Sequence, residues 1–229
     1  WTPEEWLELL PVTGAVQIEG RAVRFRVWRY LVYGVNGHTI PIYLLDTGLP
    51  ENDASDRTLT DTLYGGDQRY RLSQEALLGI GGIALLRALG HDRIDTYHMN
   101  EGHAALLTLA LLEEHLYGRP LTAAGDDEQA KVRERCVFTI HTPVAAGHDV
   151  FPLTLAKDIL GPDIAAALEV LPSRVDGRFD MTLLALHLSR SVNAVSLRHG
   201  QVSAEMYPDY TVSAVTNGVV GGNAGPLTI

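Results

Sequence analysis

The sequence predicts an α/β fold in which a mostly parallel, doubly wound sheet is flanked by helices, with a β-hairpin near the N-terminus. Through most of the chain, short apolar runs alternate with helical patterns, and this alternation is typical of parallel sheets. Near the start, a run of alternating apolar and polar residues precedes an Asn-Gly turn, which is the pattern of a hairpin. With 229 residues, the chain is long enough to bury a sizeable core.

The hairpin is expected to come first. Residues 23–32 alternate in polarity, Asn36-Gly37 supplies a turn, and residues 40–45 form the returning strand. Residues 46–61 are rich in Gly, Pro, Asn and Asp, so we expect a loop there.

A long helix is predicted for residues 68–89, where apolar residues recur at helical spacing. Gly79, Gly81 and Gly82 lie inside it, and each costs about 1 kcal/mol relative to Ala in a helix. Close packing against a neighbouring element is the expected reason for them. Gly90 suits the C-terminal cap.

Beyond this helix the sequence pattern alternates between short strands and helices. Strands are expected at 94–99, 136–140, 192–195 and 211–215, and helices at 104–115, 152–159, 162–171, 181–190 and 199–206. Pro162 suits the first position of its helix, and Asp180 can cap the helix that follows it. The charged stretch 125–135 is expected to be a solvated loop or the start of a helix.

Composition excludes several classes of function. The net charge of -10, without a dense Lys/Arg stripe, argues against a nucleic-acid partner, and no apolar run reaches the ~20 residues of a membrane span. The single Cys136 cannot form an internal disulfide and is expected to be a buried, inert thiol. Together with a start that lacks a secretory pattern, this predicts a cytoplasmic protein. Because the chain begins at Trp1 and ends in a Gly-rich stretch, 220–229, we expect both ends to be cuts.

Ligands of open parallel sheets bind in the crevice beyond the carboxyl ends of the strands. Three segments follow predicted strands and place polar side chains there: 98–103, 140–143 and 216–218. They are the candidate functional segments.

The first of these segments contains two histidines and a glutamate. His98 and His103 are five residues apart, which on a helix separates them by about 140°, so a metal site is not favoured. We expect instead that Asn100 or Glu101 begins a helix whose free N–H groups face the crevice and suit hydroxyl-rich or anionic ligands. Simple capping by Asn100 is the structural alternative.

The second segment places His141 and Thr142 at the end of a buried strand, where a polar pair favours a functional role. His148 and Asp149 could orient the following loop, or could belong to an ordinary polar loop. No nucleophile elbow, P-loop or G-x-G-x-x-G motif occurs, so the corresponding hydrolase and nucleotide-binding functions are unsupported.

Six segments in order resemble the bacterial α-glucan phosphorylases that act on glycogen or maltodextrin. They are Leu63-Tyr64-Gly65-Gly66-Asp67, Arg71 to Glu75 with Leu78 to Gly82, Tyr97-His98-Met99-Asn100-Glu101-Gly102-His103-Ala104, Phe138 to Val144 with Gly147 to Pro152, Val192 to Ser196 with His199-Gly200, and Val215-Thr216-Asn217-Gly218-Val219. Their order and spacing match the family over roughly residues 40–219.

This resemblance implies one half of a GT-B glycosyltransferase fold, with the active site between two Rossmann-like domains. Residues 1–219 then form a partial N-terminal, glucan-side domain, residues 220–229 depart from the family pattern, and the C-terminal domain with its cofactor lysine is absent. The implied reaction transfers a terminal glucosyl unit of an α-1,4-glucan to inorganic phosphate, giving glucose 1-phosphate. The implied cofactor is pyridoxal phosphate, and whether the full-length protein is a homo-oligomer stays open.

The resemblance also assigns roles to residues. His141 matches a catalytic histidine that contacts the glucosyl unit, with its main-chain carbonyl near the developing positive charge. Asn217 matches an asparagine that binds the sugar, and Thr142, Glu101 and His103 match residues that line the same cleft. Glu101 stands where many relatives carry Asp.

Two alternatives remain open on the sequence. One is a related GT-B enzyme, a glycogen or starch synthase that uses a sugar nucleotide. The other is a carbohydrate-binding fragment without catalysis. Because the cofactor lysine lies outside the chain, we expect the chain itself to be inactive.

Overall fold

The protein is described by a computed structural model, which covers residues 2–63, 65–142, 144 and 148–217. The predicted tail at 220–229 lies outside the described residues. Three sheets and seven α-helices are described in this part of the chain, and the main sheet is parallel, as the sequence predicts.

The N-terminal sheet is antiparallel, with the order β1 (Glu8–Ile18), β2 (Arg21–Tyr33) and β3 (Thr39–Asp46). A short 3-10 turn, η1 (Pro3–Glu5), precedes it. The hairpin of β2 and β3 confirms the sequence prediction, and the inward side chains Val23, Phe25 and Val27 are fully buried.

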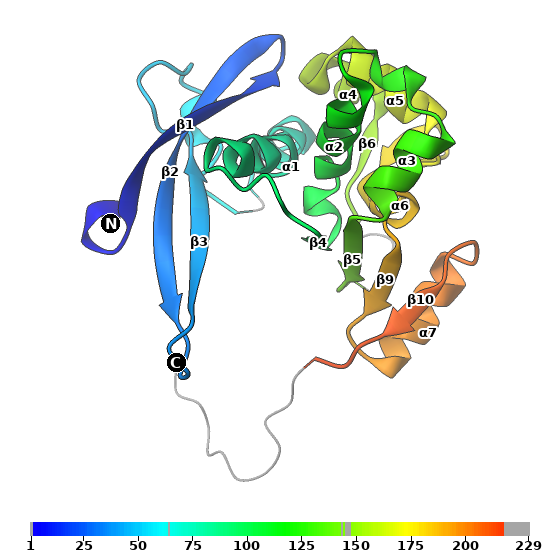
Figure 1. Ribbon diagram of the computed structural model, residues 1–229. Coiled ribbons are helices and arrows are strands. Elements are labelled where there is room, and N and C mark those ends of the chain that lie inside the picture. The colour runs from blue at the N-terminus through cyan, green and yellow to red at the C-terminus, as the bar shows by residue number, and fades with distance from the viewer. Residues whose placement is uncertain (1, 64, 143, 145–147, 218–229) are drawn as a thin grey trace.

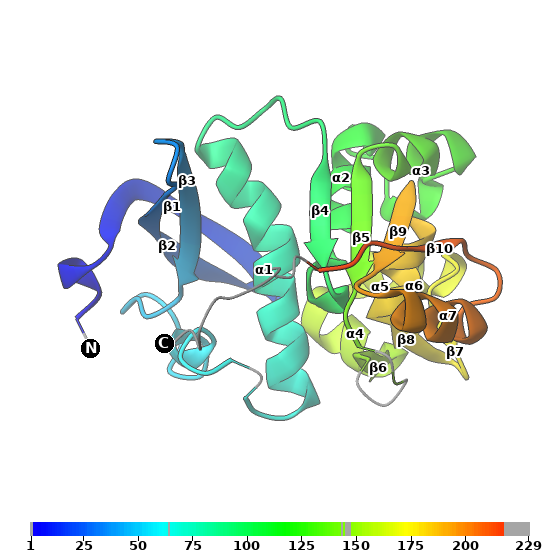
Figure 2. The same ribbon diagram turned by 90° about the horizontal axis from the view of Figure 1, so that it is seen from below.

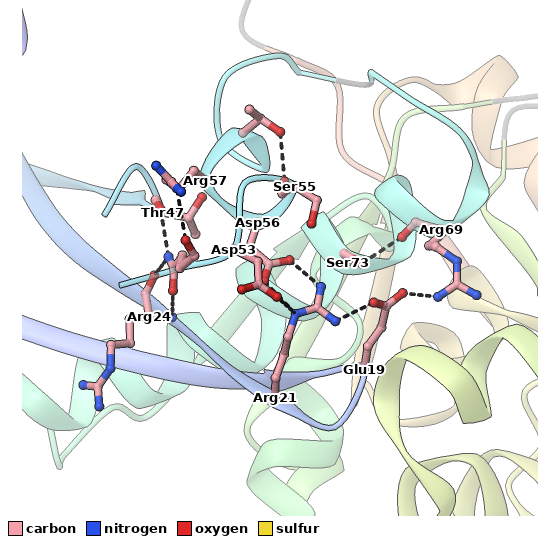
Figure 3. Close-up of polar contacts among 12 residues, drawn as sticks. Glu19, Arg21, Arg24, Thr47, Asp53, Ser55, Asp56, Arg57, Arg69 and Ser73 are labelled. Carbon is pink, nitrogen blue, oxygen red and sulfur yellow. Dashed lines mark hydrogen bonds and ion pairs between the residues drawn. The ribbon is translucent and has the colours of Figure 1, made fainter. Parts of the chain in front are cut away.

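A network of ion pairs ties the β1–β2 turn to the loop after β3, which contains η2 (Asp56–Thr58), and to the first helix. Arg21 contacts Glu19 and also Asp56, whose side chain is buried, and Glu19 contacts Arg69 on the helix (Figure 3). Asn52 joins the same loop to β2, because its side chain bonds both backbone groups of Arg24.

Helix α1 (Gln68–Ala88) lies between the antiparallel sheet and the parallel sheet (Figure 2). Asp67 caps it by accepting from the Tyr70 amide, and Gly90, at φ +78°, follows its end as predicted. The helix can approach the antiparallel sheet on one side and Leu107 on the other because it carries glycines. A Cβ on Gly79 would lie 2.8 Å from the Leu107 nitrogen, and one on Gly81 would lie 3.0 Å from Val16, whereas one on Gly82 would meet nothing. Close packing thus accounts for the first two glycines and not for the third.

The parallel sheet has the order β10-β9-β5-β4. Its strands are β4 (Tyr97–Asn100), β5 (Cys136–Ile140), β9 (Ser191–Ala194) and β10 (Val212–Ala214). All four were predicted, although three begin or end at different residues. The flanking helices, seen in Figure 1, are α2 (Leu107–Leu116), α3 (Asp126–Arg133), α4 (Leu153–Leu160), α5 (Pro162–Val170), α6 (Met181–His187) and α7 (Leu197–Met206).

Several local predictions are confirmed. Asp180 caps α6 by accepting from the amides of Thr182 and Leu183, and Pro162 opens α5. Cys136 is buried, and burial raises the pKa of its thiol to about 12, so it is an inert core residue.

Two elements were not predicted. β1 lies at the edge of its sheet, and a small antiparallel sheet forms from β6 (Val150–Pro152), β8 (Arg178–Asp180) and β7 (Arg174–Val175). The stretch 125–135 contains helix α3 and the 3-10 turn η4 (Leu121–Ala123) precedes it. Among the described residues, no helix is both long enough and apolar enough to cross a membrane.

Candidate functional site

The three candidate segments leave the parallel sheet at one edge. Asn100 pairs with Thr139, and Ile140 and Ala214 both pair with Ala194, so the carboxyl ends of the four strands are aligned. Glu101, His141 and the residues after β10 follow directly from these ends. The sequence expectation that these segments share one edge is confirmed.

Glu101 and His141 are in direct contact. The carboxylate of Glu101 accepts a short hydrogen bond from the backbone N–H of His141, and the Glu101 amide donates to the carbonyl of Thr139 at 2.9 Å. Glu101 is only 8% exposed, and its carboxylate bonds the neighbouring main chain and not the solvent. Its backbone has φ +66° and ψ 172°, a region that side chains rarely adopt and that costs about 1–3 kcal/mol. Backbone strain of this kind is concentrated at functional sites.

The imidazole of His141 is exposed and oriented by a neighbour. Its Nε2 donates to the side-chain oxygen of Asn100 at 2.7 Å. The prediction that Asn100 or Glu101 begins a helix is wrong. A single 3-10 turn, η3 (Gly102–Ala104), follows Glu101, and α2 begins only at Leu107. The side chain of Asn100 bonds His141 instead of capping, because β5 brings His141 within its reach.

His103 belongs to a partly buried cluster of charged residues. Arg71 and Glu75, one turn apart on α1, form an ion pair at 2.9 Å, and Arg71 also pairs with Asp149 at 2.9 Å. The Nδ1 of His103 lies 2.9 Å from Asp149 and 3.7 Å from Glu75. We call Arg71, Glu75, His103 and Asp149 the charge cluster.

The cluster shifts the pKa of each of its titratable members. Burial raises the pKa of Glu75 to about 7, and the hydrogen bond to Asp149 raises the pKa of His103 to about 9. Burial alone would raise the pKa of Asp149, but hydrogen bonds from His103 and Arg71 hold it well below its usual range. Arg71 and Glu75 were not predicted as site residues, although their i, i+4 spacing of opposite charges is a signal for a pair on one helix face.

The donor atoms of Glu75, His103 and Asp149 lie within 4.8 Å of one another, a spacing that could hold a metal ion. Arg71, however, donates to both carboxylates. Its guanidinium already supplies the positive charge between them, so we assign the cluster to ion pairing.

The connection between β5 and β6 is held from several sides. The carbonyl of Thr142, which is half-buried, lies 3.1 Å from Nε2 of His148, and Nδ1 of His148 lies 2.5 Å from the hydroxyl of Tyr207. His148 therefore joins Thr142, at the start of this connection, to Tyr207, and the expectation that His148 and Asp149 orient the whole connection stays a prediction. Pro143 and Gly147 lie outside the described residues.

Asn217 lies at the same edge but two strands away from β5. Its backbone N–H donates to the carbonyl of Val195 at 3.2 Å, just beyond β9, and its side chain is exposed. The structure thus brings Glu101 and His141 together, and it places Asn217 on the same edge without a recorded contact to them among the described residues.

A row of polar side chains crosses the parallel sheet and was not predicted. Nε2 of His98 lies 2.7 Å from the hydroxyl of Thr139, which in turn donates to Asn193 at 2.9 Å. His98 and His103 therefore belong to different clusters.

Two cavities flank the charge cluster. One, of about 420 Å³, has largely apolar walls that include several leucines and reaches Arg71, Glu75 and His103. The other, of about 630 Å³, is lined by polar groups that include Asp67, Arg71, His148 and Asp149. Neither cavity is lined by Glu101, His141 or Asn217.

The chain is similar in sequence to named phosphorylases. It is 39% identical over 230 residues to the maltodextrin phosphorylase of Thermococcus litoralis, a match that covers 91% of this chain and 26% of that protein. It is 37% identical over 239 residues to the glycogen phosphorylase of Mycobacterium tuberculosis, covering 91% and 26%. With the glycogen phosphorylase of Aquifex aeolicus it shares 32% identity over 233 residues, covering 93% and 33%.

No family model matches the chain. The chain spans about a quarter to a third of the length of these curated relatives. Nearly the whole of it takes part in each match, at identities well above chance, and the matches agree in the kind of protein they name. By its sequence, the chain belongs to the maltodextrin and glycogen phosphorylase family and corresponds to a part of the length of these relatives.

Proposed function

We propose that this chain is the glucan-side part of an α-1,4-glucan phosphorylase with the GT-B fold. In the longer protein, the terminal glucosyl unit of the glucan passes to inorganic phosphate, giving glucose 1-phosphate and a glucan shorter by one unit. Residues 1–219 form a partial N-terminal domain in this proposal. The similarity to phosphorylases over 91% of the chain carries it, together with the contact of Glu101 and His141 at the sheet edge.

In this proposal His141 is the catalytic residue of the chain. Its exposed imidazole can bond sugar hydroxyls, and Asn100 fixes the direction of the ring. The carboxylate of Glu101 fixes the main chain at the same residue. A main-chain carbonyl held in this way can stabilise the positive charge that develops on the glucosyl unit, because its dipole needs no reorganisation.

The remaining site residues have supporting roles. Asn217 and Thr142 bind the glucan in this proposal, and the exposed amide of Asn217 suits sugar hydroxyls. Glu101 acts on the glucan through His141, because its own carboxylate is buried. His103 lines the cleft as a cation held by Asp149.

The family resemblance implies pyridoxal phosphate as the cofactor, which would supply a phosphate group for proton transfer to the substrate phosphate. Neither lysine of this chain is placed where it could attach the cofactor. The cofactor forms an imine with a lysine inside a cavity, whereas Lys131 and Lys157 are exposed residues of α3 and α4, and neither lines the two cavities. We therefore place the cofactor lysine outside this chain and assign the chain no step through the cofactor.

The test has two parts. The 229-residue chain with added pyridoxal phosphate, maltodextrin and inorganic phosphate is expected to release no glucose 1-phosphate, and measurable release would refute the assignment as an incomplete site. The longer protein is expected to use glucose 1-phosphate and not ADP-glucose for glucan extension. The reverse preference would favour the alternative, a synthase that uses a sugar nucleotide.

A further inference from the structure

The charge cluster joins three separate elements of the fold. Arg71 and Glu75 come from α1, His103 from η3, and Asp149 from the connection between β5 and β6. This is the connection that begins at His141. The cluster is therefore the place where the connection is attached to the long central helix.

Asp149 makes contacts with both its side chain and its backbone. Its Oδ2 lies 2.9 Å from Arg71 Nη2 and 2.9 Å from His103 Nδ1, while its backbone carbonyl accepts from the amide of Met181 at 3.1 Å. Met181 is the first residue of α6. Asp149 thus holds the connection against α1, η3 and α6 at once.

Glu75 competes with Asp149 for the same cations. Its Oε1 accepts from Arg71 at 2.9 Å and lies 3.7 Å from the His103 nitrogen. The side chain is only 3% exposed. Its other oxygen, Oε2, is fully buried and has no hydrogen-bond partner among the described residues. A buried carboxylate with one unsatisfied oxygen is costly, so this site favours the protonated form.

The proton of Glu75 changes the balance at Asp149. With a proton, Glu75 is neutral and no longer competes as an anion for Arg71 and His103, so Asp149 keeps both cations. Without a proton, a second negative charge stands beside Asp149 and draws on Arg71 and His103. Burial raises the pKa of Glu75 to about 7, so the change falls near neutral pH.

Other titratable groups face this end of the connection. On the side of α6, burial raises the pKa of Asp180. The charge on Asp149 raises this pKa further, while His148 lowers it. Asp180 is committed to capping α6, and His148 is bonded to Tyr207. On the side of α1 and η3, the cations are Arg71 and His103.

We infer that Asp149 is a positioning residue which holds the β5–β6 connection against α1, and that Glu75 strengthens this hold while protonated and weakens it when charged. The inference goes beyond the proposed function and does not depend on the substrate. It gives the residue that leads into β6 a pH-dependent attachment to α1.

The test uses amide hydrogen exchange by NMR on the 229-residue chain. The protection factor of the Met181 amide, corrected for intrinsic exchange, reports local opening at Asp149. We expect it to fall several-fold between pH 6 and pH 8, while the Leu112 amide in α2 keeps its protection. In Glu75→Gln, which mimics the protonated carboxyl, the Met181 amide should keep its pH 6 protection at pH 8. In Asp149→Asn, protection should be low at both pH values.

A second measurement needs no variant. The ¹³C signal of the Glu75 carboxyl gives its titration midpoint in the wild-type chain, and this should coincide with the midpoint of the loss of protection at Met181. Protection that is independent of pH, a midpoint far from that of Glu75, or the same fall in Glu75→Gln as in the wild type would each overturn the inference.

Discussion

Glu101 combines two features that rarely occur together in one residue. Its backbone has a positive φ, which disfavours any side chain, and its carboxylate is nevertheless buried and bonded to the His141 amide. Glycine would relieve the backbone strain but would remove the carboxylate. The side chain of Glu101 therefore makes a contact with His141 that glycine could not make.

Replacing Glu101 tests this view. In Glu101→Ala the amide of His141 loses its acceptor, and we expect the free energy of unfolding to fall by about 1.5–3 kcal/mol, the usual contribution of a hydrogen bond to a charged group. Glu101→Gln keeps an oxygen at this place and should cost less. Denaturant titration of both variants measures the difference. Equal stability of Glu101→Ala and the wild type would show that the bond contributes nothing.

Single residues with a clear local pattern were predictable from the sequence. Asp180 was identified as a helix cap and Cys136 as an inert core thiol, because capping and burial depend on adjacent residues. The partners of Asn100 and Glu101 were not predictable, because both bond to His141, 40 or more residues away. The charge cluster was missed for the same reason, since Asp149 lies 78 residues from Arg71.

At the scale of elements, α1 shows how glycines allow a helix to approach another helix, α2, on one side and the antiparallel sheet on the other. Gly79 faces the backbone of α2, while Gly82 faces open space. The same residue type in the same helix therefore has opposite consequences.

Two alanine substitutions separate these consequences. Gly79→Ala places a Cβ 2.8 Å from the Leu107 nitrogen, so α1 and α2 must move apart and the chain should lose stability, by about 1–3 kcal/mol for overpacking. Gly82→Ala meets no atom and should stabilise the chain by up to about 1 kcal/mol through helix propensity. Thermal unfolding of the pair checks this, and a shift of both variants in one direction contradicts the assignment.

The reasons why β1 and the small sheet were not predicted can be identified. β1 contains Pro11 and Gly14, which argue against a central strand. It is an edge strand with a register shift between Leu9 and Thr13, and Gly14 lies against the ring of Phe25, where a Cβ would collide. The strands of the small sheet have only two or three residues, too few to show a period.

At the scale of the whole molecule, the order of strands determines what the site can be. The parallel sheet β10-β9-β5-β4 brings three segments far apart in sequence to one edge, and α1 connects this sheet to the antiparallel one (Figure 2). The alternation of strands and helices made this arrangement predictable. The partner domain across the cleft belongs to the proposal, since the chain spans only about a quarter to a third of its relatives.

The measurement that tests the central claim most directly is phosphorolysis of maltodextrin by the longer protein carrying His141→Ala, with His38→Ala in the exposed hairpin turn as the control. Loss of a contact made in the transition state costs about 2.7–4 kcal/mol. We therefore predict that His141→Ala releases glucose 1-phosphate roughly 10²–10³ times more slowly, with an unchanged circular dichroism spectrum, while the control keeps its rate. A near-normal rate in a folded His141→Ala variant would contradict the placement of the active site at this edge of the sheet.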